Sequence, residues 1–396
     1  MKSNYFDCFN LKGEKIMLNV NAKVLLTAAK QSIFEVKSSM EVLQKILVTC
    51  DKNDKNLKIE ATDLDCSTEF LLLCKKSPSF KAFNFMVNGP DLIDSVAMFS
   101  DYDIVTLTVK EDKLILSDTG NFSVELEIDL NVDDFPQLPE ISSGKDIFIK
   151  SQDFKTLLDD TVYCISDDYT RPHICHGLLE INNKSLNLIS TDGHRLAKSS
   201  AVTEYQNVNQ ENILVHRKAL SYLGKLKLVD TVAIRHSDQH VAFSFSHKAN
   251  TKTLSVVGTI YTKKELDYEF PPYDQVIPKE HNNSMKLSLD ELHKALSRFK
   301  AGKSKDRKVE LHLESELLTM KTDNNRQVIK QTLLPTLFEG SECIMGVNIS
   351  FLTETIAAFK KGGKNGMITI KFAKVLDPLI IQDSKARCTT ILMPMR

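Results

Sequence analysis

The sequence predicts an α+β protein of three repeated domains, and two motifs that recur at the same spacing support this prediction. A Thr-Asp pair follows a strand-like run at Thr62, Thr191 and Thr322, at intervals of 129 and 131 residues. A valine followed by asparagine or histidine, with leucine five residues after the valine, recurs at intervals of 128 and 132 residues. These stretches begin at Val87, Val215 and Val347. A period of about 130 residues corresponds to one domain for each repeat.

An amphipathic helix is predicted early in the repeats. In the third repeat, Ser288 is placed to cap a helix whose apolar face consists of Leu289, Leu292, Leu296 and Phe299. In the second repeat, Ser151 precedes a similar apolar series, which consists of Phe154, Leu157, Leu158, Val162 and Ile165. Spacings of three and four residues place such side chains on one side of a helix, where they face a core.

A second helix is predicted to follow the valine motif of each repeat. Its N-cap position holds Asn88, His216 and Asn348, and asparagine is a favourable cap. The apolar stripe of this helix in the third repeat is Leu352, Ile356 and Phe359. The remaining residues are predicted as strands, because apolar and polar residues alternate, as at 105–109 and 122–128. Helices that cover one face of a sheet would bury the apolar side of both.

Two proline-containing linkers separate the predicted domains. They are "DDFPQLPE" at 133–140 and "EFPPYDQVIPKE" at 269–280, and their prolines favour an extended connection. The predicted division is an N-terminal extension at 1–16 and domains at 17–143, 144–280 and 281–396. The strand-like run that begins at Met17 also allows Met17 to be the true start of the protein.

Composition excludes few partners but indicates a reducing compartment. The chain has 51 basic and 52 acidic residues, so its net charge of −1 neither requires nor excludes nucleic acid. The eight cysteines form no C-x-x-C pair, which argues against a disulfide framework and favours the cytoplasm. No apolar run approaches the roughly 20 residues of a membrane span, and the first twenty residues lack the apolar segment of a signal peptide.

The stretch "ISTDGHRLAKSS" at 189–200 resembles a catalytic motif because an aspartate, a histidine and an arginine are close together. Asp-Gly between strands is, however, a strong signal for a hairpin turn. The other repeats keep a turn at this place without the histidine and arginine. No nucleophile motif accompanies His194, so we interpret Asp192 and Gly193 as a turn. His194, Arg195 and Leu196 are then specific to one repeat, which makes them candidates for function.

Two further segments are open to a functional interpretation. The terminal "TTILMPMR" at 389–396 is apolar up to its last residue, so it is either a core strand or one wall of a binding groove. "HICH" at 173–176, together with His194, imitates a metal site. If this segment is a strand, residues 173 and 175 share a face while 176 points away, and three ligands would not converge. We therefore predict no metal and no cofactor.

Several stretches together resemble the bacterial β sliding clamp family, the processivity subunit of DNA polymerase III. They are "STDGHRLA" at 190–197, "DDFPQLPE", "VNISFLTETIAAF" at 347–359 and the terminal "MPMR". The resemblance extends from about Met17 to Arg396. It implies a non-catalytic homodimer, in which two chains join head to tail as a ring around duplex DNA. Its helices would line the central hole, and its partners would be the replicative polymerase, the clamp loader and other proteins that bind through short peptides.

The resemblance implies a partner-peptide pocket between the second and third domains. Its residues in this chain would be Cys175, Thr191, Gly193, His194, Arg195, Leu196, Pro271, Val276, Asn348, Phe351, Leu376, Pro378, Ile391, Met393, Pro394, Met395 and Arg396. Cys175 stands where the family usually has an aliphatic residue. The chain also stops at Arg396, where many family members have one residue more.

DNA-facing cations are expected near helix ends and in two loops. They are Lys37, Arg171, Arg217, Lys225, Arg298, Lys300 and Lys303. Lys37 lies in "KSSMEVL", which lacks the prolines of the corresponding family stretch, and Arg171 lies in "DDYTRPH". A helix C-terminus also favours cations for reasons unrelated to DNA. The alternative function is therefore a scaffold of the same three-repeat fold that does not encircle DNA.

Overall fold

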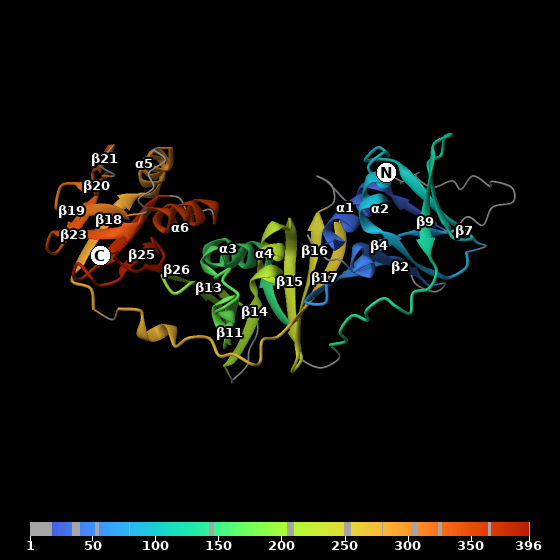
Figure 1. Cartoon of the computed structure of the whole chain (residues 1–396), viewed down its shortest axis with the longest axis horizontal. Helices are drawn as coiled ribbons and strands as arrows, with labels where there is room; N and C mark the ends of the chain where they lie inside the picture. Colours follow the sequence, from blue (N-terminus) through green and yellow to red (C-terminus); the bar gives the residue numbers. More distant parts are fainter. Residues whose placement is uncertain are drawn as a thin grey trace. The chain divides into compact units, whose positions relative to one another are not determined.

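The computed structural model describes residues 18–33, 40–51, 55–78, 80–141, 146–203, 210–248, 255–278, 280–301, 308–323, 327–362 and 366–395. The predicted extension at 1–16 lies outside these residues. The chain divides into two compact units (Figure 1). The first unit comprises Met1–Asp146 and Lys227–Lys263, and the second comprises Ile147–Leu226 and Lys264–Arg396. Each unit is described by itself.

The first repeat forms two helices and a series of strands. In chain order these are β1 (Leu18–Asn21), α1 (Ala22–Ser32), η1 (Glu41–Gln44), β2 (Lys45–Cys50), β3 (Asn56–Thr62), β4 (Cys66–Leu73), β5 (Lys75–Lys76), β6 (Phe83–Asn88), α2 (Gly89–Val96), β7 (Ile104–Lys110), β8 (Lys113–Ser117) and β9 (Ser123–Asp129).

The second repeat has the same order of long elements, with short 3-10 turns inserted. They are β10 (Ile147–Lys150), α3 (Ser151–Thr161), η2 (Val162–Cys164), η3 (Pro172–Ile174), β11 (His176–Asn182), β12 (Ser185–Thr191), β13 (Arg195–Val202), β14 (Glu211–His216), α4 (Arg217–Lys225), β15 (Leu228–His236), β16 (His240–Lys248), β17 (Ser255–Lys263) and η4 (Tyr273–Gln275). The predicted strand around residues 173–175 is wrong, because η3 is a helical turn and β11 begins only at His176.

The third repeat follows the same plan and confirms the predicted three-repeat α+β fold. Its elements are β18 (Asn283–Ser288), α5 (Leu289–Ala301), β19 (Lys308–Leu313), β20 (Leu318–Asp323), β21 (Val328–Leu333), β22 (Leu337–Glu339), β23 (Cys343–Asn348), α6 (Ile349–Lys361), β24 (Met367–Phe372), β25 (Leu379–Asp383) and β26 (Cys388–Leu392). No helix in the described parts of the chain is both long and apolar enough to span a bilayer.

Neighbouring repeats are joined by pairing of one strand from each. In the first unit, β4 of the first repeat pairs antiparallel with β17 of the second, from Leu71 opposite Val257 to Cys66 opposite Thr262. We call this pairing the first junction. In the second unit, β13 pairs in the same way with β26 of the third repeat. We call this pairing the second junction. Both junctions continue a sheet from one repeat into the next.

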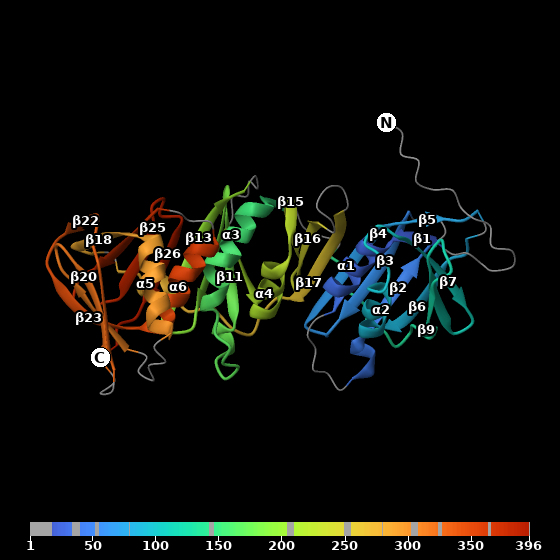
Figure 2. The same ribbon diagram turned by 90° about the horizontal axis from the view of Figure 1, so that it is seen from above.

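The sheets of the two units follow from these junctions. Within the first unit the strand order is β15-β16-β17-β4-β3-β2-β6-β9-β8-β7-β1-β5. The second unit has a sheet of order β14-β11-β12-β13-β26-β25-β24-β18-β22 and a four-stranded sheet of order β21-β20-β19-β23. In the second unit, helices α3 to α6 gather on one face of the long sheet (Figures 1 and 2). The opposite face carries the linker at 269–280, which includes the short turn η4.

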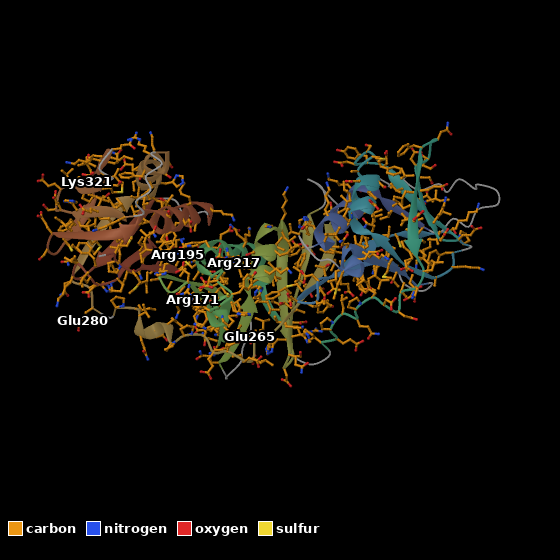
Figure 3. All side chains as sticks on the ribbon, viewed as in Figure 1. Arg171, Arg195, Arg217, Glu265, Glu280 and Lys321 are labelled. Atoms are coloured by element: carbon orange, nitrogen blue, oxygen red, sulfur yellow. The ribbon has the colours of Figure 1, made fainter. Side chains whose placement is uncertain are left out.

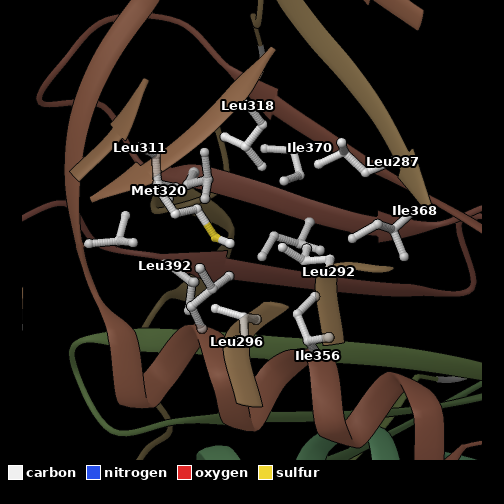
Figure 4. Close-up of a cluster of buried hydrophobic side chains, with 14 of the residues drawn as sticks. Leu287, Leu292, Leu296, Leu311, Leu318, Met320, Ile356, Ile368, Ile370 and Leu392 are labelled. Atoms are coloured by element: carbon white, nitrogen blue, oxygen red, sulfur yellow. The ribbon is translucent and has the colours of Figure 1, made fainter. Parts of the chain in front are cut away.

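The apolar faces predicted for the helices form the cores. In the third repeat, Leu292 and Leu296 of α5 and Ile356 of α6 are at most 1% exposed and pack with strand residues such as Leu311 and Ile370 (Figure 4). The predicted N-caps are confirmed as well. The side chain of Asn88 accepts a hydrogen bond from the backbone N–H of Asp91, and Asn348 accepts one from that of Ser350. His216 caps α4 through Nδ1.

Candidate functional site

The Thr-Asp-Gly-His segment is a tight turn between β12 and β13. The carboxylate of Asp192 accepts hydrogen bonds from the backbone N–H groups of His194 and Arg195, both at 2.9 Å. The hydroxyl of Thr191 donates to the carbonyl of Arg195 at 2.7 Å. Gly193 has a φ of 86°, which glycine adopts without a steric penalty. The prediction of a structural turn is confirmed, since the side chain of Asp192 is used to form it.

The first repeat builds the same turn from other residues. The hydroxyl of Thr62 donates to the carbonyl of Cys66, and the carboxylate of Asp63 accepts from the N–H groups of Asp65 and Cys66. Leu64 takes the left-handed conformation that Gly193 has in the second repeat, with a φ of 75°. The Thr-Asp pair thus serves the hairpin in both repeats, whereas the residues after it differ.

Arg195 is the residue that distinguishes the second-repeat turn. Its side chain is 7% exposed and lies at the second junction. Its Nε donates to Asp192 at 3.0 Å, its Nη2 donates to the carbonyl of Tyr163 at 2.9 Å, and its Nη1 lies 2.7 Å from a carboxylate oxygen of Glu354 on α6. The guanidinium also lies over the ring of Phe351, 4.5 Å from its centroid. Arg195 therefore connects the second and third repeats.

The groups around Arg195 are poorly suited to nucleophilic catalysis. Cys164 is fully buried, and its burial raises the pKa of the thiol to about 12. The hydroxyl of Tyr163 shares hydrogen bonds with Thr355 and Thr390, and burial raises its pKa well above the usual value. A thiol or phenol with a raised pKa stays protonated at neutral pH, and the protonated form is not a nucleophile.

A cavity of about 280 Å³ lies beside the turn, on the face of the sheet opposite the helices. Its apolar wall contains Leu196 of β13 and Ile391 of β26, which are opposite each other at the second junction. Its lining consists of Arg171, His173, Ile174, Thr191, Gly193, Arg195, Leu196, Pro271, Tyr273, Val276, Ile391 and Met393. Eight predicted pocket residues are among them. The site is an apolar depression with a polar rim, a combination typical of ligand sites.

A second cavity of about 380 Å³ continues from the first. It shares Val276 and Met393 with the first cavity and extends over Pro378 and Phe372 of the third repeat. The two cavities together provide places for more than one side chain of an extended ligand. Met393, which is 39% exposed, separates them, and its flexible thioether suits a wall that adapts to different ligands.

The linker between the second and third repeats closes one side of the cavity through Tyr273. The hydroxyl of Tyr273 donates to Glu180 at 2.7 Å and accepts a hydrogen bond from Lys198 at 2.9 Å. Its ring packs in a cluster with Leu178, Ile189, Leu196, Leu214 and Ile391. Sequence reasoning missed Tyr273, His173 and Ile174. When the two linkers are aligned on their shared Phe-Pro, Leu138 of the first linker corresponds to Tyr273 of the second. A tyrosine present in only one linker was the sequence signal that could have identified Tyr273.

Several predicted pocket residues support the cavity without lining it. His194 is exposed, and its ring stacks on Phe351 with centroids 6.1 Å apart. Asn348 caps α6 through its side chain. The backbone N–H of Met395 donates to the carbonyl of Gly346 at 2.7 Å, and that of Met393 donates to the carbonyl of His194 at 2.9 Å. The chain end is thereby held against both repeats.

The remaining predicted pocket residues lie further from the cavity or outside the described residues. Cys175 is 3% exposed, and its thiol donates to the carbonyl of Asp168, so it is covered rather than part of the wall. Leu376 is 58% exposed, in the loop before Pro378. Pro394 is half-buried between the two anchored methionines. Arg396 lies outside the described residues.

The predicted DNA-facing arginines of the second repeat are close to the cavity and to α4 (Figure 3). Arg171 lines the cavity, and its Nε donates to Asp168 at 3.0 Å. Arg217 begins α4 and lies 3.7 Å from the exposed carboxylate of Asp167. Lys225 is exposed in the last turn of α4. Arg217 pairs with Asp167 and Arg171 pairs with Asp168, because these aspartates lie in the acidic loop just before Arg171.

The other predicted cations are on α5 or outside the described residues. Arg298 is exposed on α5, and its guanidinium contacts the side chain of Gln331. The side chain of Lys300 and the whole of Lys37 and Lys303 are outside the described residues. On α6, Lys361 lies 2.9 Å from Asp159 of α3, and Lys360 pairs with Asp290 of α5. Acidic residues therefore offset part of the positive charge on the helices.

Comparisons with known proteins agree with this architecture along nearly the whole chain. The three domains of the DNA polymerase III beta subunit match in order. The N-terminal domain matches residues 16–139, the central domain 148–258 and the C-terminal domain 274–396.

Individual relatives and solved structures show the same likeness at low identity. The chain is 24% identical over 362 residues to the beta sliding clamp of Vibrio cholerae, covering 91% of this chain and 93% of that one. It is 25% identical over 288 residues to that of Escherichia coli, covering 72% and 74%. The fold matches the Pseudomonas aeruginosa sliding clamp bound to griselimycin with a TM-score of 0.84, at 21% identity, over 97% and 100% of the two chains. It matches the Bacillus subtilis clamp with a TM-score of 0.83, at 17% identity, over 96% and 99%.

Proposed function

The chain belongs to the DNA polymerase III β-subunit family, and on that premise we propose that it is a DNA sliding clamp that encircles duplex DNA as a homodimeric ring. The observation that supports ring closure is the repeated junction. At the first junction, β4 of the first repeat pairs with β17, the last strand of the second repeat. At the second junction, β13, which corresponds to β4, pairs with β26, the last strand of the third repeat. The corresponding strands that belong to neither junction are β21 in the third repeat and β9 in the first. Pairing β21 of one chain with β9 of a second copy would use the same contact again.

The two strands are suited to this pairing. β21 is the edge strand of its four-stranded sheet. In the described residues, β9 pairs along its length with β8, whereas β6 reaches it only at Ile128 and Asp129. β9 carries the exposed carboxylates of Glu125 and Glu127, and β21 carries the exposed Lys330. An open edge with complementary charges is a template for strand addition. Head-to-tail use of both edges by two copies closes a ring.

The helices supply a surface for DNA without base recognition. We propose that the lining includes Lys37, Arg217, Lys225, Arg298, Lys300 and Lys303, whereas Arg171 belongs to the cavity on the opposite face of the sheet. Cations that meet phosphates hold DNA independently of its sequence, and a ring keeps DNA by topology. The acidic partners on α3 and α5 limit the net charge, which favours sliding over tight binding. The domain division at 17–143, 144–280 and 281–396 belongs to the same proposal.

We propose that the cavity beside the second junction binds short peptides of the replicative polymerase, the clamp loader and other partners. Leu196, Ile391 and Met393 can bury two apolar side chains, at roughly 1.5–3 kcal/mol each. The cost of ordering the peptide leaves weak to moderate affinity. Arg171 and His173 can fix the polar groups of the peptide. Such affinity suits partners that exchange on one clamp in the cytoplasm.

Catalysis is assigned to the partners. The clamp would act as a non-catalytic processivity subunit that needs no metal or cofactor. The raised pKa values of Cys164 and Tyr163 support this assignment.

Retention on DNA tests the proposal. Protein assembled on nicked circular duplex DNA should stay bound at moderate salt and leave when a restriction enzyme linearises the circle. Linear DNA whose ends are blocked by bound streptavidin should retain the protein. Equal retention on open linear and circular DNA would exclude topological binding. Absence of retention on both, with peptide binding intact, would favour the alternative of a scaffold without DNA encirclement.

A further inference from the structure

The first junction has a cleft of about 910 Å³, on the face of the sheet that bears Glu60 and Glu69. It lies entirely within the first unit, between the sheet and the linker at 132–141. Phe135 of this linker is 6% exposed and holds it to the sheet. We call this space the first-junction cleft. Its volume is in the range of ligand-binding clefts, roughly 300–1,000 Å³.

The floor of the first-junction cleft is a polar row across the sheet. Glu60 on β3 is directly opposite Glu69 on β4, and Glu69 is opposite Thr259 on β17. Thr259 is in turn opposite Ser244 on β16, and their hydroxyls are 3.0 Å apart. Two carboxylates that face each other across neighbouring strands repel, so this pair costs stability.

The cations in the cleft do not balance its carboxylates. Lys58 is 3.1 Å from Glu60 and 4.0 Å from Glu69, so one ammonium serves both. Arg235 is held by Asp146 through two hydrogen bonds of 2.7 Å, which leaves its charge already paired. The side chain of Glu60 is only 8% exposed, and water therefore screens the surplus negative charge poorly. Burial and the nearby Glu60 raise the pKa of Glu69, as expected for a carboxylate that shares one distant ammonium with another carboxylate.

Apolar side chains continue the cleft along the same face. Leu71 and Leu73 follow Glu69 at every second position of β4, and Val257 is opposite Leu71 on β17. Leu73 is 79% exposed and Val257 is 47% exposed. Aliphatic side chains that are exposed next to a polar cleft are typical of an interaction surface.

We propose that the first-junction cleft is a second binding site, and that it takes an extended peptide segment of a partner protein in which an arginine or lysine is flanked by apolar residues. The cationic side chain would lie between Glu60 and Glu69, where it supplies the missing positive charge. Apolar residues two and four positions from the cation share its face in an extended peptide, and they would cover Val257 and Leu73. This site does not depend on ring closure or on the partner cavity at the second junction.

Fluorescence anisotropy with the full-length protein tests the site. The probe is fluorescein-labelled Gly-Arg-Gly-Leu-Gly-Leu-Gly amide, in which arginine and both leucines share one face of the extended peptide. Its control replaces arginine with citrulline, which has the same shape without the charge. The arginine probe should bind at least about tenfold more tightly than the citrulline probe. Equal affinity of the two, or no binding up to about 5 mM, a limit near the weakest specific affinities, would overturn the proposal.

Two variants locate the binding. Glu60→Gln and Glu69→Gln should each weaken binding of the arginine probe by about tenfold, the effect of losing one charged contact. Glu316→Gln, an exposed position in the β19–β20 turn, makes the same chemical change elsewhere and should leave binding unchanged. Equal weakening by Glu316→Gln would overturn the site. Thermal denaturation excludes unfolding as the cause, because Glu69→Gln removes a repulsion and should raise the melting temperature while it lowers affinity.

Discussion

The first and second junctions join neighbouring repeats through corresponding strands, β4 with β17 and β13 with β26. The side chains on the outer faces of these strands differ in chemistry. Glu60 faces Glu69 at the first junction, and the corresponding pair at the second is Ile189 and Lys198. At the second junction, Tyr273 covers this pair and joins an apolar cluster. At the first, Leu138 aligns with Tyr273 in the sequence, and a polar cleft lies between the linker and the sheet. The backbone plan is thus constant, and a few side chains give the two junctions surfaces of different chemistry.

The first residue of the joining strand also differs between β13 at the second junction and β4 at the first. Arg195 opens β13 opposite Leu392, and Cys66 opens β4 opposite Thr262. The thiol of Cys66 donates to the hydroxyl of Thr262 at 3.7 Å. Arg195 instead contacts Asp192, Tyr163 and Glu354. The second junction therefore relies on a charged group, and the first relies on packing.

The largest effect is expected from Arg195→Ala. The change leaves Asp192 and Glu354 without their partner and should cost about 2–4 kcal/mol, less than for a fully buried pair because Glu354 is half exposed. Urea denaturation measures the loss. Arg195→Lys should recover little, because an ammonium lacks the planar fork that lies over Phe351 and reaches Asp192, Tyr163 and Glu354 from separate nitrogens. Cys66→Ala is the matched change at the first junction and should cost about 1 kcal/mol. Equal losses for Arg195→Ala and Cys66→Ala would contradict the difference between the junctions.

Removing residues 393–396 should have the next largest effect, on peptide affinity. Met393 forms part of both cavities at the second junction, so the truncation opens them. A peptide with a glutamine and two apolar side chains should bind about 10–100-fold more weakly, as expected for losing one apolar wall. Leu392 is retained because it is 2% exposed in the core. Val257→Ala, an apolar change at the first junction, serves as control. Unchanged affinity after truncation would place the peptide elsewhere.

Tyr273→Phe should have a moderate effect. The change removes the hydroxyl that connects Glu180 and Lys198, and it should lower stability by about 1–2 kcal/mol. Peptide affinity should fall by a few-fold, because the linker that closes the cavity is held less firmly. Tyr268→Phe changes an exposed tyrosine just before this linker and should have no effect on either measurement. A similar response to both changes would show that Tyr273 does not anchor the linker.

The smallest effect is a gain of stability from Glu69→Gln at the first junction. Because the pKa of Glu69 is raised in the folded protein, its ionisation lowers stability as pH rises through that pKa. The variant should therefore be more stable than the wild type at pH 7 by about 0.5–1 kcal/mol, the cost of one cross-strand repulsion. Below about pH 4 both forms are uncharged and the difference should vanish. Melting temperatures between about pH 3 and pH 8 measure this, and a gain that persists unchanged at low pH would contradict the role of charge.

Local patterns in the sequence were sufficient for the fold. The face of α5 from Leu289 to Phe299 is buried as its spacing predicts, and Asn88 and Asn348 cap helices as expected. The turn at Asp192 and Gly193 was also predictable, since its hydrogen bonds lie within five residues. These features depend on neighbours in the chain, and periodicity reports such neighbours directly.

The site was predictable only in part, because its contacts join distant residues. The lining by Leu196 and Ile391 depends on pairing of β13 with β26, almost 200 residues apart. Arg195 was expected at the polar rim, and the structure shows most of its guanidinium used between repeats. The opposition of Glu60 and Glu69 follows from strand register, which no single stretch of sequence displays.

The stoichiometry of peptide binding tests most directly whether the two junctions differ in the ligand they accept. Isothermal titration of the full-length protein with a peptide carrying a glutamine and two apolar side chains should give one site per chain. Leu196→Ala should weaken that site, and Ser67→Ala, the corresponding change at the first junction, should leave it unchanged. Two equivalent sites per chain, or equal weakening by both changes, would contradict the account.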